Sequence, residues 1–291
     1  MEEEQGRLVY LPEYQHWRTS PWWKVMLIGL ALYGVGITIL ALTKNFKLLP
    51  AVVLLGTFIM PVTYVTFFYN HRVLSQITIL TLGLTFFYGG ILGIFAAALL
   101  EPLFIRQLNF YSSFKVGLIE EFAKILGVLA IARHRRHDSE MDGLILGAAA
   151  GMGFASLESA GYAFVAFLHS QGNLSVMTAV TLIRGVLTPL GHGTWTAILA
   201  GVLFRESTER KFIIDWQVIG TYLFVSVLHG LWDGLPFAMA SLNQVGIEFF
   251  IGELVVGGIG IFVLARMWRE ARRLQITRYL EAGAINQRRA A

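Results

Sequence analysis

The chain has 291 residues, of which 55% are hydrophobic and only 14% are charged, and its mean hydropathy is +0.61. A soluble domain carries roughly a quarter charged residues, so this composition excludes an ordinary globular enzyme, a disordered chain and a nucleic-acid binder. The net charge of +4 therefore has to be interpreted by where the basic residues lie. Cysteine is absent, which rules out disulfides, thiolate nucleophiles and Cys-ligated zinc.

Apolar segments long enough to cross a bilayer, about 20 residues each, follow one another along the chain. They begin after a polar stretch at residues 1–21 and end before a basic tail at residues 267–291. We expect eight spans, near residues 22–42, 48–69, 76–100, 114–132, 142–168, 176–204, 214–239 and 246–266. The sequence therefore predicts an all-α polytopic membrane protein with a single transmembrane domain over residues 22–266.

The basic residues are divided unevenly between the two ends of these spans. Of the 23 Lys and Arg residues, 17 fall at the ends where both termini lie and four at the opposite ends, while Lys124 and Arg184 lie inside spans. Cytoplasmic segments of membrane proteins are enriched in Lys and Arg. We therefore expect a multi-pass protein of the cell membrane with both termini in the cytoplasm. The basic tail, residues 267–291, is predicted to extend the last helix along the membrane surface.

Small residues recur at every fourth position of the fifth span, at Gly143, Gly147, Gly151, Ala155 and Ser159. In membrane helices this spacing is typical of close packing against a neighbouring helix. We expect the fifth span to pack closely against a neighbouring helix.

Ionisable residues inside spans are the informative feature, because each costs roughly 2.5–3.5 kcal/mol at a helix centre. The fourth span carries Glu120, Glu121 and Lys124. Since residues three and four apart share a helix face, Lys124 can neutralise either carboxylate and leave the other for acid–base chemistry. An internal ion pair of purely structural role is the alternative, but it would need only one of the two acids.

The fifth and sixth spans add an acid, Glu158, and a predicted helix face that carries Arg184, Thr188 and His192. Glu158 requires a partner from another helix, and pairing with Arg184 alone is its structural alternative. Pro189 removes a backbone donor and predicts a kink beside His192. A hydrogen bond across helices is the alternative role for this histidine.

The seventh span places His229 and Asp233 four residues apart, on one helix face. A carboxylate there can fix the imidazole tautomer, or the pair can hold a metal or an oxyanion. At 1.5 Å per residue, the acids and histidines of the four spans lie roughly 9–20 Å below the outer ends of their helices. We therefore expect one water-accessible site between helices 4, 5, 6 and 7.

Four motifs, each inside a span, resemble in type and order those of the PrsW-type intramembrane proteases: Glu120-Glu121-x-x-Lys124, Phe154-x-x-x-Glu158, His192 after Arg184 and Pro189, and His229-x-x-x-Asp233. That family sits in the superfamily of the CAAX prenyl endopeptidases. The resemblance covers about residues 115–240, the motif-bearing core. CAAX-type members usually have a histidine where this chain has Glu158, which favours the PrsW branch.

The resemblance implies an endopeptidase that hydrolyses a peptide bond of a membrane-associated protein in the lipid bilayer, with no nucleic-acid partner. The substrate would be an anti-sigma factor or another single-pass protein. The implied catalytic residues are Glu120, Glu121, Glu158, His192, His229 and Asp233, with Lys124 and Arg184 as partners that keep carboxylates ionised.

The mechanism stays open between two forms. In a metallopeptidase, Zn²⁺ would be held by His192 and His229, and Glu120 would deprotonate the bound water. One or two further ligands would come from Glu121, Glu158 and Asp233. In a metal-free form, Glu120 would activate water directly, while His229 with Asp233 would stabilise the oxyanion.

A proton-coupled membrane transporter is the alternative from another functional class, because chains of Glu, His and Asp can relay protons through a membrane. The sequence shows no internal repeat of the kind common in transporters. Its charged cluster also stays in the outer and middle depth of the bilayer. These observations favour the peptidase.

Overall fold

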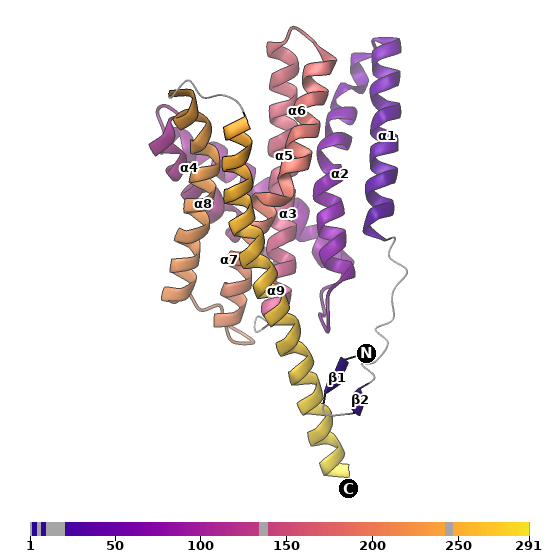
Figure 1. Cartoon of the computed structure of the whole chain (residues 1–291), viewed down its shortest axis with the longest axis vertical. Coiled ribbons are helices and arrows are strands. Elements are labelled where there is room, and N and C mark those ends of the chain that lie inside the picture. Colours follow the sequence, from indigo (N-terminus) through magenta and orange to yellow (C-terminus); the bar gives the residue numbers. More distant parts are fainter. Residues whose placement is uncertain (1, 5–6, 10–20, 134–138, 242–246, 291) are drawn as a thin grey trace.

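The computed structural model describes residues 2–4, 7–9, 21–133, 139–241 and 247–290, and its architecture is helical (Figure 1). The helices are α1 (Trp22–Thr43), α2 (Leu49–Asn70), α3 (Ile79–Phe104), α4 (Phe110–Ala132), α5 (Glu140–His169), α6 (Leu174–Leu187), α7 (His192–Glu206), α8 (Trp216–Ser241) and α9 (Ile247–Ala290). Two 3₁₀ turns, η1 (Phe46–Leu48) and η2 (Thr188–Leu190), precede α2 and α7. Two three-residue strands, β1 (Glu2–Glu4) and β2 (Arg7–Val9), pair in antiparallel fashion ahead of the helical domain.

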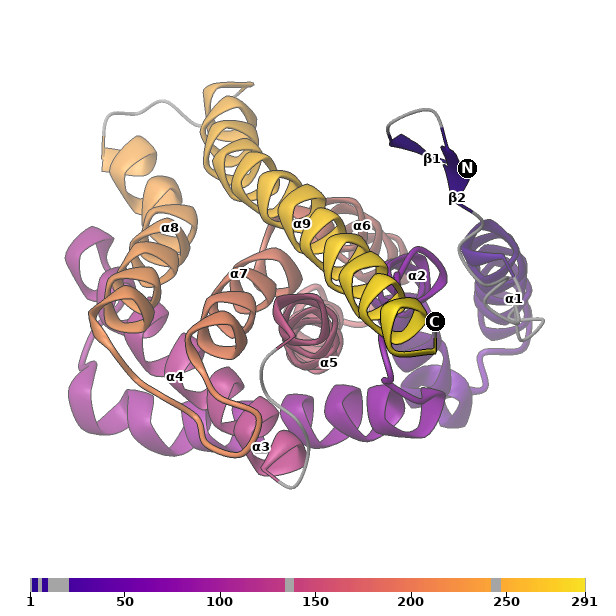
Figure 2. The same cartoon turned by 90° about the horizontal axis from the view of Figure 1, so that it is seen from below.

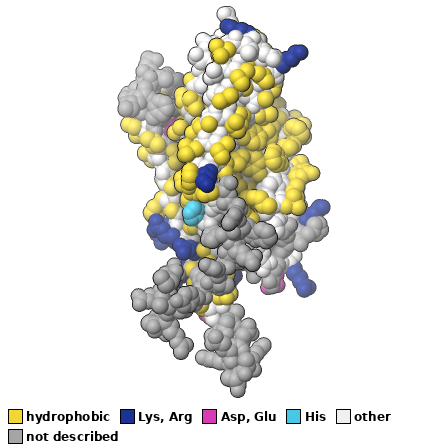
Figure 3. All heavy atoms as spheres, turned by 90° about the vertical axis from the view of Figure 1, so that its right-hand side faces the viewer, with side chains coloured by type: hydrophobic (Ala, Val, Ile, Leu, Met, Phe, Trp, Pro, Cys, Tyr) yellow, Lys and Arg dark blue, Asp and Glu magenta, His cyan; other side chains and the backbone are white. Residues whose placement is uncertain are grey.

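Seven helical segments of the described chain are long and apolar enough to cross a membrane. Helix α4, with 23 residues, has the length as well, but its composition is too polar because of four charged side chains: Lys115, Glu120, Glu121 and Lys124. The eight predicted spans thus correspond to seven apolar segments and one charged helix. Large apolar side chains are exposed along these segments and occupy much of the upper part of the face in Figure 3, as expected for a surface in contact with lipid. The predicted all-α polytopic membrane fold is confirmed.

The sixth predicted span is interrupted at Pro189. Helix α6 ends before it, the turn η2 contains it, and α7 begins at His192. The carbonyl oxygen of Pro189 accepts a hydrogen bond from Thr194 Oγ1 at 2.7 Å, so the break leaves this polar group satisfied. The kink predicted beside His192 is confirmed. The three residues Arg184, Thr188 and His192 do not lie on one continuous helix as predicted, although Arg184 and His192 both contact Glu158 Oε2.

Helix α5 lies at the centre of the bundle and contacts α2, α3, α4, α6, α7 and α9 (Figure 2). A Cβ added to Gly147 would lie 2.3 Å from the carbonyl oxygen of Thr196, and one added to Gly151 would lie 2.3 Å from that of His192. On the opposite side of α5, Gly153 approaches the backbone of α3 just as closely. The predicted close packing of the fifth span is confirmed, and it brings the first residue of α7 against α5.

The last helix, α9, has 44 residues and extends beyond the lower ends of the other helices in Figure 1. Gln275 Nε2 donates a 2.7 Å hydrogen bond to Ser139 Oγ, which ties this arm to the start of α5. The predicted helical extension is therefore present. Its position along a membrane surface stays a prediction, and most of the predicted N-terminal segment, residues 1–21, lies outside the described residues.

We expect Gly147→Ala to destabilise the bundle, because the added methyl group would force α5 and α7 apart at the Thr196 carbonyl. Overpacking of this kind costs about 1–3 kcal/mol. The midpoint of thermal unfolding in detergent, followed by circular dichroism, should fall. Gly161→Ala on the same helix is the control, since nothing lies within 4 Å of a Cβ added there. Equal midpoints for the two variants would contradict the packing.

Candidate active site

The structure brings the eight residues singled out from the sequence into one cluster. Four helices and the start of a fifth supply them: Glu120, Glu121 and Lys124 on α4, Glu158 on α5, Arg184 on α6, His192 at the start of α7, and His229 and Asp233 on α8. Because α4 begins at Phe110 and not near residue 114, Glu120 lies about 15 Å from the start of its helix. The cluster is therefore nearer the middle of the bundle than the sequence predicted.

Lys124 is the centre of the cluster, and its side chain is fully buried. Its Nζ lies 2.8 Å from Glu121 Oε1, 3.2 Å from Glu120 Oε2 and 2.8 Å from His192 Nδ1. The ammonium also sits 4.3 Å from the centroid of the Phe154 ring, a cation–π distance. Lys124 contacts both carboxylates, and the Nδ1 atom of His192 accepts a hydrogen bond from the charged amine.

Glu121 is buried, and both of its carboxylate oxygens have partners. Its Oε1 lies 3.0 Å from His229 Nδ1, and its Oε2 accepts a hydrogen bond from Thr196 Oγ1 at 3.1 Å. A carboxylate on one ring nitrogen fixes the histidine tautomer and orientation. The other nitrogen, His229 Nε2, then faces Glu120 Oε2 at 3.5 Å and Asp233 Oδ2 at 3.3 Å.

Glu158 makes the equivalent contact with the second histidine. Its Oε2 lies 3.0 Å from His192 Nε2 and 2.6 Å from Arg184 Nη2. Arg184 Nε donates to Ser159 Oγ at 3.0 Å, and the guanidinium lies 4.1 Å from the centroid of the Tyr162 ring. Glu158 therefore pairs with Arg184 and His192 together, so the alternative of a pair with Arg184 alone does not describe it.

Glu120, His192 and His229 form the group best placed to hold a metal among the described residues. One donor atom from each lies within 4.8 Å of the others, all three residues are buried, and the two imidazole centroids are 4.9 Å apart. Two of the donors, Glu120 Oε2 and His229 Nε2, are buried and lie 3.5 Å apart, and their contacts with Lys124 and Asp233 are ion pairs without hydrogen-bond geometry. Two histidines and one glutamate are a common ligand set of catalytic zinc, so these residues fit such an ion.

This geometry differs from the ligand set inferred at the sequence level. There, Glu120 was the base, and the ligands beside the histidines were expected among Glu121, Glu158 and Asp233. In the structure Glu121 and Glu158 each hold one histidine from its far side, which is the position of a supporting carboxylate. The Oε2 atom of Glu120 faces both rings, 3.9 Å from His192 Nδ1 and 3.5 Å from His229 Nε2.

Sequence reasoning missed Glu101, a half-buried carboxylate near the end of α3 whose side chain interacts electrostatically with the acids of the cluster. We had placed the end of the third span at residue 100, so this residue fell in a loop. The antiparallel packing of α3 and α4, in which Gly89 lies against Gly127 and Gly93 near Lys124, brings the end of α3 toward Glu120. The sequence signal that could have identified Glu101 is a carboxylate at the end of an apolar span.

Trp195 was also missed, because it reads as an ordinary apolar residue. Its fully buried ring lies 4.9 Å from His229, 5.6 Å from His192 and 5.7 Å from Trp232, measured between centroids. These rings pack one side of the two imidazoles and exclude water there.

The cluster is more enclosed than the water-accessible cavity expected from the sequence. The side chains of Glu121, Lys124 and His229 are at most 1% exposed, whereas those of Glu158 and Asp233 are 19% and 36% exposed. The cluster therefore opens to the outside of the bundle at the edge formed by Glu158 and Asp233.

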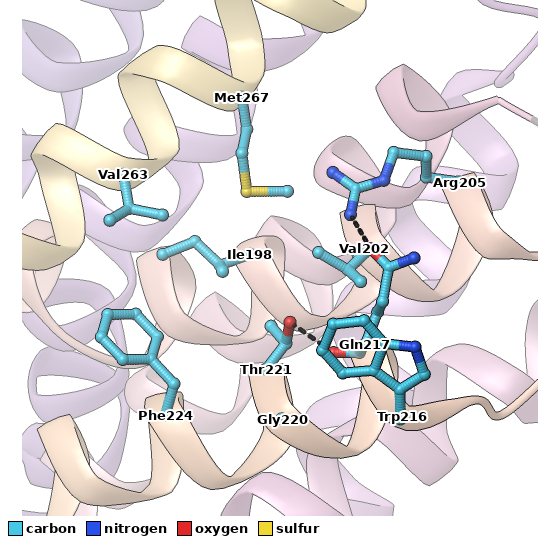
Figure 4. Close-up of a pocket in the computed structure, with 10 residues that line it drawn as sticks. All are labelled: Ile198, Val202, Arg205, Trp216, Gln217, Gly220, Thr221, Phe224, Val263 and Met267. Carbon is cyan, nitrogen blue, oxygen red and sulfur yellow. Dashed lines mark hydrogen bonds between the residues drawn. The ribbon is translucent and has the colours of Figure 1, made fainter.

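A cavity of about 310 Å³ lies elsewhere, between α7, α8 and α9 (Figure 4). Its walls contain none of the clustered residues: Ile198, Val202, Arg205, Trp216, Gln217, Gly220, Thr221, Phe224, Val263 and Met267. It is lined largely by apolar side chains and lies toward the C-terminal end of α7, away from His192.

Comparison with known proteins identifies the family. The model of the PrsW family intramembrane metalloproteases matches residues 21–265, which include the whole cluster. Protease PrsW of Halalkalibacterium halodurans is 29% identical over 176 residues, which cover 58% of this chain and 76% of that protein. No solved structure matches the chain. The match favours the peptidase over the proton-coupled transporter: the chain belongs to the PrsW family of intramembrane metalloproteases.

Proposed function

We propose that this multi-pass protease hydrolyses a peptide bond of a single-pass membrane protein at the centre formed by Glu120, His192 and His229. The observation that carries the proposal is the convergence of three donor atoms from three helices within 4.8 Å in a buried place. Burying these groups is costly, and a structural ion pair would need no such set of converging donor atoms.

A zinc ion bound by these three residues would polarise the scissile carbonyl and make its water acidic enough to ionise near neutral pH. Two supporting carboxylates hold the ligands in place. Glu121 binds His229 Nδ1 and leaves Nε2 toward the centre, while Glu158 binds His192 Nε2 and leaves Nδ1 toward it. For His192 Nδ1 to bind the metal, its hydrogen bond from Lys124 would have to break, because this nitrogen has one lone pair.

Asp233 is the proton acceptor in this form of the mechanism. Its Oδ2 lies 3.3 Å from His229 Nε2, and its side chain is the most exposed of the clustered carboxylates. A general base has to be within reach of the attacking water, and Asp233 stands at the open edge of the cluster. In the metal-free form Glu120 Oε2 takes the proton directly, and His229 with Asp233 stabilises the oxyanion.

The protein is proposed to lie in the cell membrane with both termini in the cytoplasm, following the asymmetry of 17 basic residues against four. The arm of α9 and the N-terminal strands then share the cytoplasmic side. In this orientation the edge formed by Glu158 and Asp233 faces the outer half of the bilayer, so the scissile bond lies in or just below that half.

Glu120→Gln is the direct test of the proposed centre. The amide keeps the shape but binds metal poorly and cannot accept a proton, so cleavage of a co-reconstituted single-pass reporter should fall by a factor of about 10² or more. Cleavage is measured by gel and mass spectrometry. Glu206→Gln, at the far end of α7, is the matched control and should cleave normally. Activity retained by Glu120→Gln would remove this residue from the centre.

A double variant distinguishes a role of Glu158 in orienting His192 from a role in neutralising Arg184. Glu158→Gln should abolish cleavage, since His192 loses its orienting carboxylate. If Glu158 served only to neutralise Arg184, then Glu158→Gln combined with Arg184→Met should restore activity. We expect the double variant to stay inactive in the same assay while remaining folded by circular dichroism. Recovered cleavage would make Glu158 a structural residue.

A further inference from the structure

The position of His192 depends on the break between α6 and α7. Pro189 has no N–H to continue the helix, and carbonyl oxygens in the break lose the partners that a continuous helix would give them. Inside a membrane no water replaces those partners. The side chain of Thr194 does so for Pro189, because its Oγ1 donates a 2.7 Å hydrogen bond to the Pro189 carbonyl oxygen. This bond closes a loop over residues 189–194 that contains His192.

Tyr64 on α2 holds this loop from outside. Its hydroxyl oxygen lies 2.9 Å from Thr194 Oγ1. A threonine hydroxyl has a single proton, and Thr194 gives it to the Pro189 carbonyl oxygen. Tyr64 is therefore the donor and Thr194 the acceptor in their contact. The chain Tyr64–Thr194–Pro189, which we call the hydroxyl relay, connects α2 with α7 and η2, and each of its bonds polarises the other.

The contact made by Tyr64 differs from that of many hydroxyl groups in this bundle. The side chains of Thr57, Ser156 and Thr181 donate to the carbonyl oxygen four residues earlier in their own helix, which satisfies the hydroxyl without joining two helices. Tyr64 instead contacts a residue 130 positions away in the chain. Its ring lies 4.8 Å from that of the buried Phe68, measured between centroids, so packing on α2 holds the phenol in place.

The loop held by the relay carries the imidazole of His192. This ring has a partner at each nitrogen, Lys124 at Nδ1 (2.8 Å) and Glu158 at Nε2 (3.0 Å). These contacts orient the ring, but its place in the site depends on the backbone that carries it. Thr194 is fully buried, and its backbone N–H donates to the Gly191 carbonyl oxygen at 2.9 Å. A catalytic site needs its side chains within about 0.5 Å of the productive geometry, so this backbone has to be held.

We propose that Tyr64 is a positioning residue of the site. Through the hydroxyl of Thr194 it fixes the turn before α7 and thereby the place of His192 beside Glu120 and His229. Tyr64 acts only through Thr194 and is not itself a catalytic residue. This inference deepens the proposed peptidase function and rests on it, because the position of His192 matters for cleavage only if cleavage takes place at that centre.

Tyr64→Phe tests the proposal, since it removes the hydroxyl and keeps the packed ring. In the reporter cleavage assay kcat should fall about tenfold, as for other groups that orient a catalytic histidine, while KM stays unchanged. Tyr33→Phe is the matched control. Tyr33 is buried against Gly56 of α2, and its hydroxyl has no hydrogen-bond partner in the described part of the chain, so kcat should not change. An unchanged kcat in Tyr64→Phe, or the same loss in both variants, would overturn the proposal.

Variants of Thr194 test whether Tyr64 acts through this residue. Thr194→Ser keeps the hydroxyl and should retain the kcat of the unmodified protein, whereas Thr194→Val keeps the shape, loses both bonds and should reduce kcat at least as much as Tyr64→Phe. The double variant Tyr64→Phe with Thr194→Val should be no slower than Thr194→Val alone, because the two changes break one chain of bonds. Losses that multiply in the double variant would show separate actions and overturn the relay.

Amide hydrogen exchange separates this inference from the proposed function, because it needs neither zinc nor cleavage. It is measured by mass spectrometry on a peptide that covers residues 188–196 and on one from α1. In Tyr64→Phe the first peptide should exchange roughly fivefold faster, the factor that corresponds to one lost hydrogen bond, while the α1 peptide stays as in the unmodified protein. Faster exchange confined to residues 188–196 supports the relay even if no reporter is cleaved, a result that would count against the peptidase centre alone. Unaltered exchange, or faster exchange in both peptides, would overturn the relay.

Discussion

The buried ammonium of Lys124 is the interaction around which the site is arranged. A lysine at the centre of a membrane helix is expensive, and here it is offset by Glu120, Glu121 and the Nδ1 atom of His192. These contacts join α4 to α7, and Glu121 carries the connection on to His229 of α8. One positive charge thus holds Glu120 and Glu121 in place, and Glu121 and Glu158 in turn set which nitrogen of each histidine faces the centre.

Close packing of the helix backbones makes this arrangement of side chains possible. Gly147 and Gly151 let α5 approach the carbonyl oxygens of α7, and the break at Pro189 lets α7 begin at His192 beside them. If the helix continued through this region, His192 would have a different position relative to Arg184. The small residues and the proline therefore determine where the site residues lie, whereas the charged residues supply the reactive groups.

Much of this could be anticipated from the sequence, because helical spacing alone places Lys124 next to both glutamates and His229 above Asp233. The common depth of the acids and histidines in four spans indicated which helices converge, and the family resemblance agreed with it. The positions of the carboxylates could not be anticipated. That Glu121 and Glu158 contact the histidines from outside, and that Glu120 Oε2 faces both rings, depends on side-chain directions across helices. Glu101 was missed because its interaction with the cluster depends on the register of α3 against α4, which no local pattern encodes.

The central claim is that Glu120, His192 and His229 provide one metal centre. X-ray absorption at the zinc edge, recorded on the purified protein after chelation and reloading with a single equivalent of zinc, tests it most directly. The account predicts a site with two imidazole nitrogens and one carboxylate oxygen, lost in Glu120→Gln together with chelator-sensitive cleavage. A zinc environment without histidine, or cleavage that persists in full after zinc removal, would contradict it.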